Sequence, residues 1–488
     1  MRTDRAVALL ASGLALGILA QYLFVGERAG IGFFVLVGAV LALDAMLRAR
    51  RLPISGGQLL LPAAALIFAG FVAVRTDSSL VPFDVEAALA LCLLSVMSSR
   101  GFDVLRIHVG ALPAVAGEGL RALAMRLPAV YAVALPTLAV QTRARSSRAL
   151  PYVSGLALAA PLLVVFVLLF SAADAVFQRS LRDALDIAWL REMLPTLPQR
   201  LAVAFIVTWC ATGALGMSTA APALDGAQRR VRRLLGAEPV TVALIAIDLL
   251  FAAFVALQLT YLFGGRDTLQ ASGIAYSTYA RRGFFELLGV AALVGAVLFT
   301  FDLIVRTRNR VYVFAALVLV ALTAVVLASA ATRMTLYQEA YGWTELRLYA
   351  YAGIAFIAIA LAILAAAVVT RGMERVVAPL AAAALAVALT LNAIGPSAQV
   401  AAANIDRFLD PAPLPVDAIR DLDLTYLIAL GDGAVPAIVE RLSSLPDPER
   451  ERLSGALRIV DARRHDATGW PSWNWDRARA SELLRTVR

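Results

Sequence analysis

The chain has 488 residues, of which 60% are hydrophobic and 16% are charged, and its mean hydropathy is +0.78. Soluble chains average about 45–50% apolar and about 25% charged residues, so this composition excludes an ordinary soluble globular protein. The net charge is +9 and every basic residue is an arginine. Because the arginines cluster in short segments between apolar runs, the charge indicates orientation in a membrane rather than nucleic-acid binding.

Apolar runs recur from the N-terminus to about Asn392. A helix of about 20 apolar residues crosses the ~30 Å hydrocarbon core of a bilayer. We therefore predict an all-α fold, a polytopic transmembrane helical bundle of about eleven spans with a small helical C-terminal domain outside the membrane. The predicted spans are 6–25, 30–47, 57–74, 81–98, 151–172, 201–218, 240–263, 284–305, 311–330, 348–369 and 377–394. We predict that the first run is retained, because no convincing cleavage site follows it.

Composition divides the chain into four regions. They are N-terminal transmembrane helices at 1–100, a cytoplasmic amphipathic segment at 101–150, the main transmembrane bundle at 151–394 and a helical extracytoplasmic tail at 395–488. The second region mixes charged and apolar residues, which predicts amphipathic helices on the cytoplasmic face. Its stretch LPAVYAVALPTLAV could instead be a short re-entrant or spanning segment.

The tail loses the long apolar runs and gains acids, prolines and arginines. Pro415 predicts one helix start, and the sequence Asp447-Pro448-Glu449 predicts another. Asn474, directly before WDRARASELL, is predicted to cap a helix. These signals favour a small helical domain.

The arginine clusters orient the spans. They are Arg48, Arg50 and Arg51; Arg143, Arg145 and Arg148; Arg229, Arg230, Arg232 and Arg233; Arg306, Arg308 and Arg310; and Arg371 and Arg375. With a cytoplasmic N-terminus, every cluster falls on the cytoplasmic side, as the positive-inside rule requires. We therefore expect a multi-pass plasma-membrane protein with its C-terminus outside the cytoplasm.

Acidic residues inside the spans are expensive in lipid, so each one needs an explanation. Asp44 and Asp302 lie near arginine clusters, and local ion pairs or snorkelling would account for them. Asp248 has no charged neighbour in its own predicted helix, which makes it the best candidate for a buried functional acid. It could fix helix packing through an interhelical hydrogen bond, or it could handle protons or cations.

A second set of polar candidates lies at the predicted outer surface, close to several aromatic residues. Its members are Arg282, Glu286, Arg333, Glu339 and Arg347. Arg282 and Glu286 are four residues apart on one helix face, and Arg347 begins the tenth span. We predict that Glu286 pairs with one arginine, leaving the other to bind an anionic lipid headgroup, a small solute, or Glu339 or Glu345. The alternative is an ordinary aromatic belt with solvated charges.

Common catalytic motifs are absent from the sequence. There is no GxxxxGK[ST], HExxH, GxSxG or CxxC, so we assign no catalytic, cofactor-binding or metal-binding residue and expect no cofactor. Cys92 and Cys210 lie in apolar runs, and the two histidines are far apart. Three classes of function remain: a structural, accessory or sensory membrane protein; a transporter or channel for a small solute or ion; and a membrane-embedded lipid-handling enzyme. The expected partner is the lipid bilayer, with protein partners unknown and no nucleic acid.

Several motifs between residues 145 and 488 carry a family resemblance. They are FSAADAVF, QLTYLFGG, YSTYARRGFFELL, LYQEAYGWTELRLYA, AANIDRF, DLTYLIALGDGAVPAI and GWPSWNW. In this order they resemble bacterial integral-membrane proteins of the domain-of-unknown-function 4153/4173 type. The resemblance implies a multi-span membrane protein without an assigned biochemical activity.

Overall fold

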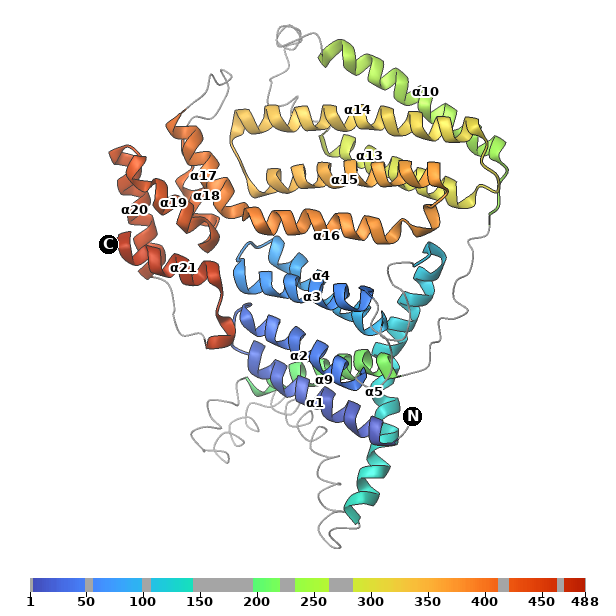
Figure 1. The fold of residues 1–488 in the computed structure, drawn as a ribbon. Helices are drawn as coiled ribbons and strands as arrows, with labels where there is room; N and C mark the ends of the chain where they lie inside the picture. The colour runs from blue at the N-terminus through green and yellow to red at the C-terminus, as the bar shows by residue number, and fades with distance from the viewer. Residues whose placement is uncertain are drawn as a thin grey trace, which may run out of the picture.

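The computed structural model describes residues 3–48, 56–98, 107–143, 196–219, 233–262, 284–410, 421–462 and 469–487. Within these ranges the protein is helical and has no strand, which confirms the all-α prediction (Figure 1). The membrane-region helices are α1 (Thr3–Phe24), α2 (Ile31–Arg48), α3 (Gly56–Val74), α4 (Leu80–Ser98), α5 (Leu112–Arg143), α9 (Leu197–Thr219), α10 (Ala237–Leu262), α13 (Phe284–Ile304), α14 (Arg310–Tyr341), α15 (Glu345–Thr370) and α16 (Val377–Ile394). The C-terminal helices are α17 (Pro396–Leu409), α18 (Leu424–Ala429), α19 (Val435–Arg441), α20 (Asp447–Ala462) and α21 (Trp475–Leu484).

Eight of the described helices are long and apolar enough to cross a membrane, namely α1, α4, α9, α10, α13, α14, α15 and α16. The apolar parts of α2 and α3 are shorter. Ten of the eleven predicted spans coincide with described helices, and the span predicted at 151–172 lies outside the described residues. The chain is therefore a helical membrane protein.

One helix is longer than its apolar run predicts. The ninth span was expected to end at Ala330, but α14 continues to Tyr341. No glycine or proline interrupts residues 331–341, so nothing in the sequence stops the helix there. Gly342 ends it with a positive φ of 77°, a conformation that glycine adopts without strain. Arg333 and Glu339 therefore lie on a helix rather than in the loop that the sequence had suggested.

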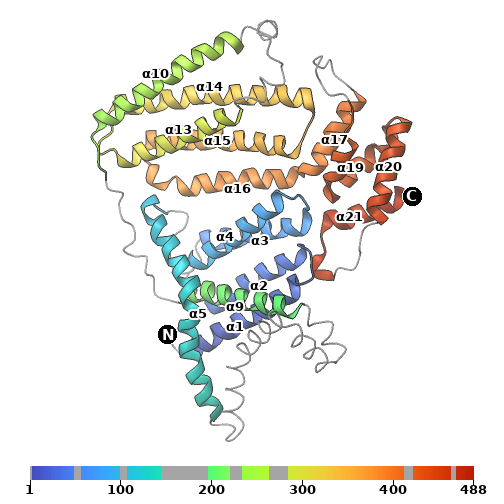
Figure 2. The ribbon, with the colours of Figure 1, turned by 180° about the vertical axis from the view of Figure 1, so that it is seen from behind.

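The membrane helices form two lobes that lie side by side (Figures 1 and 2). The N-lobe contains α1–α5 and α9, and the C-lobe contains α10 and α13–α16. In the N-lobe, Gly13 and Gly17 of α1 face Thr208 and Thr212 of α9 so closely that a Cβ atom would clash at either glycine. Small residues at such a contact let helix backbones approach closely in lipid.

The C-lobe has its own apolar core, and the lobes meet where α16 lies beside α4. In the C-lobe core, Leu244, Leu298 and Leu319 are fully buried. Leu385 and Ala388 of α16 pack against the apolar core of α3 and α4. At one end of the molecule, His108 Nδ1 lies 3.5 Å from Glu374 Oε2 and adds a polar contact between the lobes.

Helix α5 covers the end of the N-lobe at which α1 begins and runs steeply across the direction of α1 and α9 (Figures 1 and 2). Trp209 of α9 donates a hydrogen bond from Nε1 to the Leu123 carbonyl, 2.6 Å away. Gly213 of α9 also lies against the backbone of Ala122 and Leu123. The position of residues 101–150 on the cytoplasmic face of the membrane stays a prediction.

Helices α17–α21 pack around a separate core at the opposite end of the bundle (Figure 1). The core includes Ile405, Leu427, Ile438, Leu453 and Leu457, all at most 1% exposed. Two predicted helix starts in this region are confirmed. Helix α20 begins at Asp447, and Asn474 caps α21 by accepting a hydrogen bond from the Arg477 amide at 3.2 Å. Pro415 lies outside the described residues.

Candidate functional site

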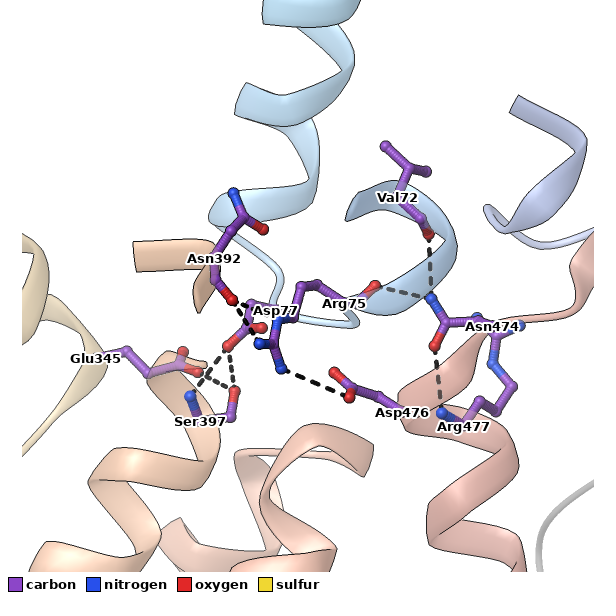
Figure 3. A network of polar contacts seen from close by, with 9 residues as sticks. All are labelled: Val72, Arg75, Asp77, Glu345, Asn392, Ser397, Asn474, Asp476 and Arg477. Atoms are coloured by element: carbon purple, nitrogen blue, oxygen red, sulfur yellow. Dashed lines mark hydrogen bonds and ion pairs between the residues drawn. The ribbon is translucent and has the colours of Figure 1, made fainter. Parts of the chain in front are cut away.

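A buried polar network lies where the C-terminal helices meet both lobes (Figure 3). We call it the junction network. It comprises Arg75 and Asp77 from the α3–α4 connection, Asp84 of α4, Glu345 at the start of α15, Asn392 of α16, Ser397 of α17, and Asn474 and Asp476 at the start of α21. These residues are far apart in the sequence, and the fold brings them to one end of the bundle.

Arg75 connects α16 to α21. Its Nε donates to the Asn392 carbonyl at 2.9 Å, and Nη2 donates to the same oxygen. Its Nη1 lies 3.7 Å from Asp476 Oδ1. The Asn392 carbonyl belongs to the last turn of α16, where carbonyls lack partners within the helix and a cation is favourable. A positive φ of 69° at Gly395 turns the chain beside this guanidinium.

Asp77 caps the first turn of α17 from another part of the chain. Its Oδ1 accepts a hydrogen bond from the Ser397 amide at 3.1 Å and contacts the Ser397 hydroxyl. Free amides at a helix N-terminus favour a carboxylate. The same hydroxyl oxygen lies 2.5 Å from Glu345 Oε1. Ser397 therefore holds two carboxyl groups from different lobes close together.

Asp84 joins the lobes within the membrane region. Asn392 Nδ2 donates to Asp84 Oδ1 at 2.8 Å, and both side chains are completely buried. Asp84 Oδ2 and Asn392 Oδ1 have no hydrogen-bond partner among the described residues. Two buried acceptors without donors carry a desolvation cost, so this pair is an unusual feature of the lobe interface.

The segment GWPSWNW at 469–475 attaches the C-terminal helices to the N-lobe. Asn474 Nδ2 donates to the Val72 and Arg75 carbonyls at 3.1 and 2.9 Å. Ser472 Oγ accepts from the Arg28 amide at 2.6 Å and contacts Glu27 Oε2. At Gly30 a Cβ atom would lie 2.5 Å from the Trp473 carbonyl, so this close approach needs glycine.

Among the network residues outside the membrane helices, Asp476 has a shifted carboxyl pKa. Burial raises the pKa of the Asp476 carboxyl to about 6, although the Arg75 guanidinium acts to lower it. Asp77 adds a further upward contribution through charge repulsion. The raised pKa means that burial outweighs the ion pair at this position.

The predicted acid Asp248 is 9% exposed and lies on α10, which packs against α14. Its Oδ1 has no hydrogen-bond partner within the described part of the chain. Asp302 does meet an arginine, since Arg308 Nη2 donates to its carboxylate and Tyr312 Oη donates at 3.1 Å. The local ion pair considered for Asp302 is therefore present, while the role of Asp248 stays a prediction.

The predicted outer polar set is only partly described. Arg282 lies outside the described residues, and Glu286 is exposed on the first turn of α13. Arg347 donates to the Gly342 carbonyl, and its guanidinium carbon lies 4.2 Å from the Tyr337 ring centroid. Arg333 is half-buried on α14.

The same end of α14 holds a second arginine that sequence reasoning did not single out. Arg407 of α17 donates to the Glu339 carbonyl at 2.9 Å. Arg347 and Arg407 therefore both donate hydrogen bonds to backbone carbonyls at the end of α14. The shared anion site with Arg282 remains a prediction.

Sequence reasoning missed most of the junction network. Arg75 and Asp77 lie in a short connection, and Asn392 and Ser397 are uncharged. Asp84, like Asp248, lies inside an apolar run. The high cost of a carboxylate in lipid could therefore have identified it from the sequence.

Together, the apolar helices and the buried polar junction define a multi-pass helical membrane protein. The model of the family described as domain of unknown function DUF4153 matches residues 63–441, and the chain belongs to this family. This confirms the family resemblance for the 4153 type. The match includes Arg75, Asp77, Asp84, Glu345, Asn392 and Ser397, but not the GWPSWNW segment. No curated protein and no solved structure matches the chain.

Proposed function

We propose that this chain is an accessory or sensory membrane protein in which the C-terminal helices control how the two lobes lie against each other. One observation carries the proposal: the junction network joins α17 and α21 to the ends of α3, α4, α15 and α16. Because α4 belongs to the N-lobe and α15 and α16 to the C-lobe, a displacement of the C-terminal helices would reach both lobes.

We further propose that the protein lies in a plasma membrane and that its C-terminal helices lie outside the cytoplasm. The arginine-rich connections that contain Arg233, Arg306, Arg371 and Arg375 lie at the end of the bundle opposite these helices (Figure 1). The positive-inside rule assigns such connections to the cytoplasm. The C-terminal helices are then suited to respond to the outer medium or to an outer partner.

The coupling can be measured with two spin labels at the end where the C-terminal helices attach. Ser78 of the N-lobe and Leu346 of the C-lobe are both exposed and suit labelling after Cys92 and Cys210 are changed to alanine. Asn474→Ala removes two hydrogen bonds to the N-lobe and the cap of α21. We expect a longer or broader distance distribution in this variant, measured by double electron–electron resonance in nanodiscs.

Asn309→Ala is the matched control, because Asn309 caps α14 near the opposite end of the bundle. It should leave the label distance unchanged. A distribution in Asn474→Ala that matches the unsubstituted chain would reject the coupling.

A transporter or channel for a proton or small cation is the second candidate function. Asp248 favours it, because a buried carboxylate oxygen without a described partner lies inside a candidate span. Proteoliposomes that contain a pH-sensitive dye test this alternative. Proton uptake that is lost in Asp248→Asn and kept in Glu238→Gln, at an exposed position on the same helix, would favour transport over the accessory role.

A further inference from the structure

At Ser397, two carboxyl oxygens of the junction network meet one hydroxyl group. Ser397 Oγ contacts Asp77 Oδ1 and lies 2.5 Å from Glu345 Oε1. A serine hydroxyl has one proton, so it donates to only one of these oxygens. The other contact requires a proton on a carboxyl group. Figure 3 shows both carboxyl groups directed at this hydroxyl.

The Asp84–Asn392 pair independently indicates a protonated carboxyl group. Asn392 Nδ2 donates to Asp84 Oδ1, and the part of the chain that the structure describes offers no donor to the buried Asp84 Oδ2 and Asn392 Oδ1. A proton on Asp84 Oδ2 would turn one of these two acceptors into a donor and remove the buried negative charge. Because both side chains are 0% exposed, solvent at the protein surface does not provide that donor.

The charges of the network are also unbalanced. Four carboxyl groups gather here, those of Asp77, Asp84, Glu345 and Asp476, and the Arg75 guanidinium acts on two of them, Asp84 and Asp476. Buried charges of one sign without partners are costly, and carboxyl groups in that situation retain protons. Other titratable or charged groups surround the network. They are Tyr349 of α15, Asp423 and Tyr426 at the start of α18, Asp432 of η4 (Asp432–Ala434), Arg347 near Tyr426, and Arg477 of α21, whose guanidinium donates to the Ser472 and Ala29 carbonyls.

We propose that the junction network is a proton-binding site that holds one proton between Glu345 and Asp77 and a second on Asp84. The ligand is the proton itself. Bound protons turn repulsive carboxylate contacts into hydrogen bonds between the α3–α4 connection, α15, α16 and α17. Loss of these protons at higher pH restores the repulsion and loosens the contact between the lobes and the C-terminal helices.

The predicted direction of the pH effect follows from proton linkage. The network packed as in this structure binds protons that a separated, hydrated network would release. Low pH therefore favours the packed form, and rising pH disfavours it. Asp476 acts in the same direction, since burial raises the pKa of its carboxyl to about 6. The consequence for the lobes rests on the proposed function, whereas the bound protons do not.

Infrared spectroscopy of the full chain in nanodiscs tests the protons directly. At neutral pH we expect protonated-carboxyl C=O bands that shift in heavy water. Glu345→Gln should remove one band and Asp84→Asn another, while Glu451→Gln, at an exposed position on α20, should remove none. Bands that are absent in the unsubstituted chain, or unchanged in both site variants, would overturn the proposal.

Ser397→Ala provides a second route if an acid variant does not fold. It removes the hydroxyl that bridges the two carboxyl groups, so the Glu345 band should move to the position of a differently hydrogen-bonded acid; an unmoved band counts against the site. The Ser78–Leu346 label distance, followed from acidic to alkaline pH, reports the coupling separately. Infrared bands as expected with a pH-independent distance would keep the proton site and reject the proposed function.

Discussion

At the scale of single residues, Asp476 gives the most direct pH prediction. Burial raises the pKa of its carboxyl from an ordinary 3.8 to about 6. Between these values the folded state binds more protons than the unfolded state, so stability decreases as pH rises through this window. We expect Asp476→Asn to have a Tm that depends less on pH there, measured by thermal unfolding in detergent. Glu451→Gln should keep the original slope, and an unaltered slope in Asp476→Asn would contradict the assignment.

Residue chemistry also explains which site residues the sequence could predict. Asp248 and Asp84 stand out because a carboxylate inside an apolar run is expensive in lipid. Ser397 and Asn392 give no such signal, since neutral polar residues are common near helix ends. The role of Arg75 depends on a backbone carbonyl of α16, which is more than 300 residues away in the sequence. Local patterns contain no information about such a partner.

At the scale of elements, the contact between α1 and α9 makes a sharp prediction. A Cβ atom at Gly17 would lie 2.1 Å from Thr208 Oγ1 and 2.4 Å from the Ala204 carbonyl oxygen. The carbonyl cannot rotate away, so Gly17→Ala must push the two helices apart, at a cost of about 1–3 kcal/mol. The Tm in detergent should fall. Gly353→Ala on α15 should not lower it, because nothing lies within 4 Å of the new Cβ and alanine favours a helix more than glycine does. Equal Tm values for the two variants would disprove the tight contact.

The helices themselves were the easiest feature to predict, because a long apolar run in lipid must be helical to satisfy its backbone. The ends of the helices were harder. Helix α14 extends past its apolar run, because polar residues without glycine or proline continue a helix as well as apolar residues do. The partner of α1 could not be predicted, although the GLALG sequence at 13–17 has the glycine spacing of a helix-packing motif.

At the scale of the whole molecule, the two lobes and their attachment depend on contacts between distant segments. The GWPSWNW segment was recognised as a motif, but its contacts with 25–31 and 72–75 follow only from the fold. Three aromatic residues of this segment, Trp470, Trp473 and Trp475, are about half exposed, and Trp470 donates to the Tyr22 hydroxyl at 3.2 Å. Exposed tryptophan at the end of a membrane bundle is typical of the lipid–water boundary. This end of the molecule is therefore expected to lie at a membrane surface.

The orientation of the whole molecule is the last prediction. Helix α1 begins at the end of the bundle opposite α17–α21, so the N-terminus of α1 and the C-terminal helices are expected on different sides of the membrane (Figure 1). The arginine-rich connections lie with the N-terminus, and the positive-inside rule places that end in the cytoplasm. Alkaline phosphatase, which is active only outside the cytoplasm, should be active when fused after Arg488. A fluorescent protein that folds only in the cytoplasm should be dark at the same position and bright when fused before Met1. A bright C-terminal fusion with an inactive phosphatase would reverse the topology, and the proton site would then sense the cytoplasm instead of the outer medium.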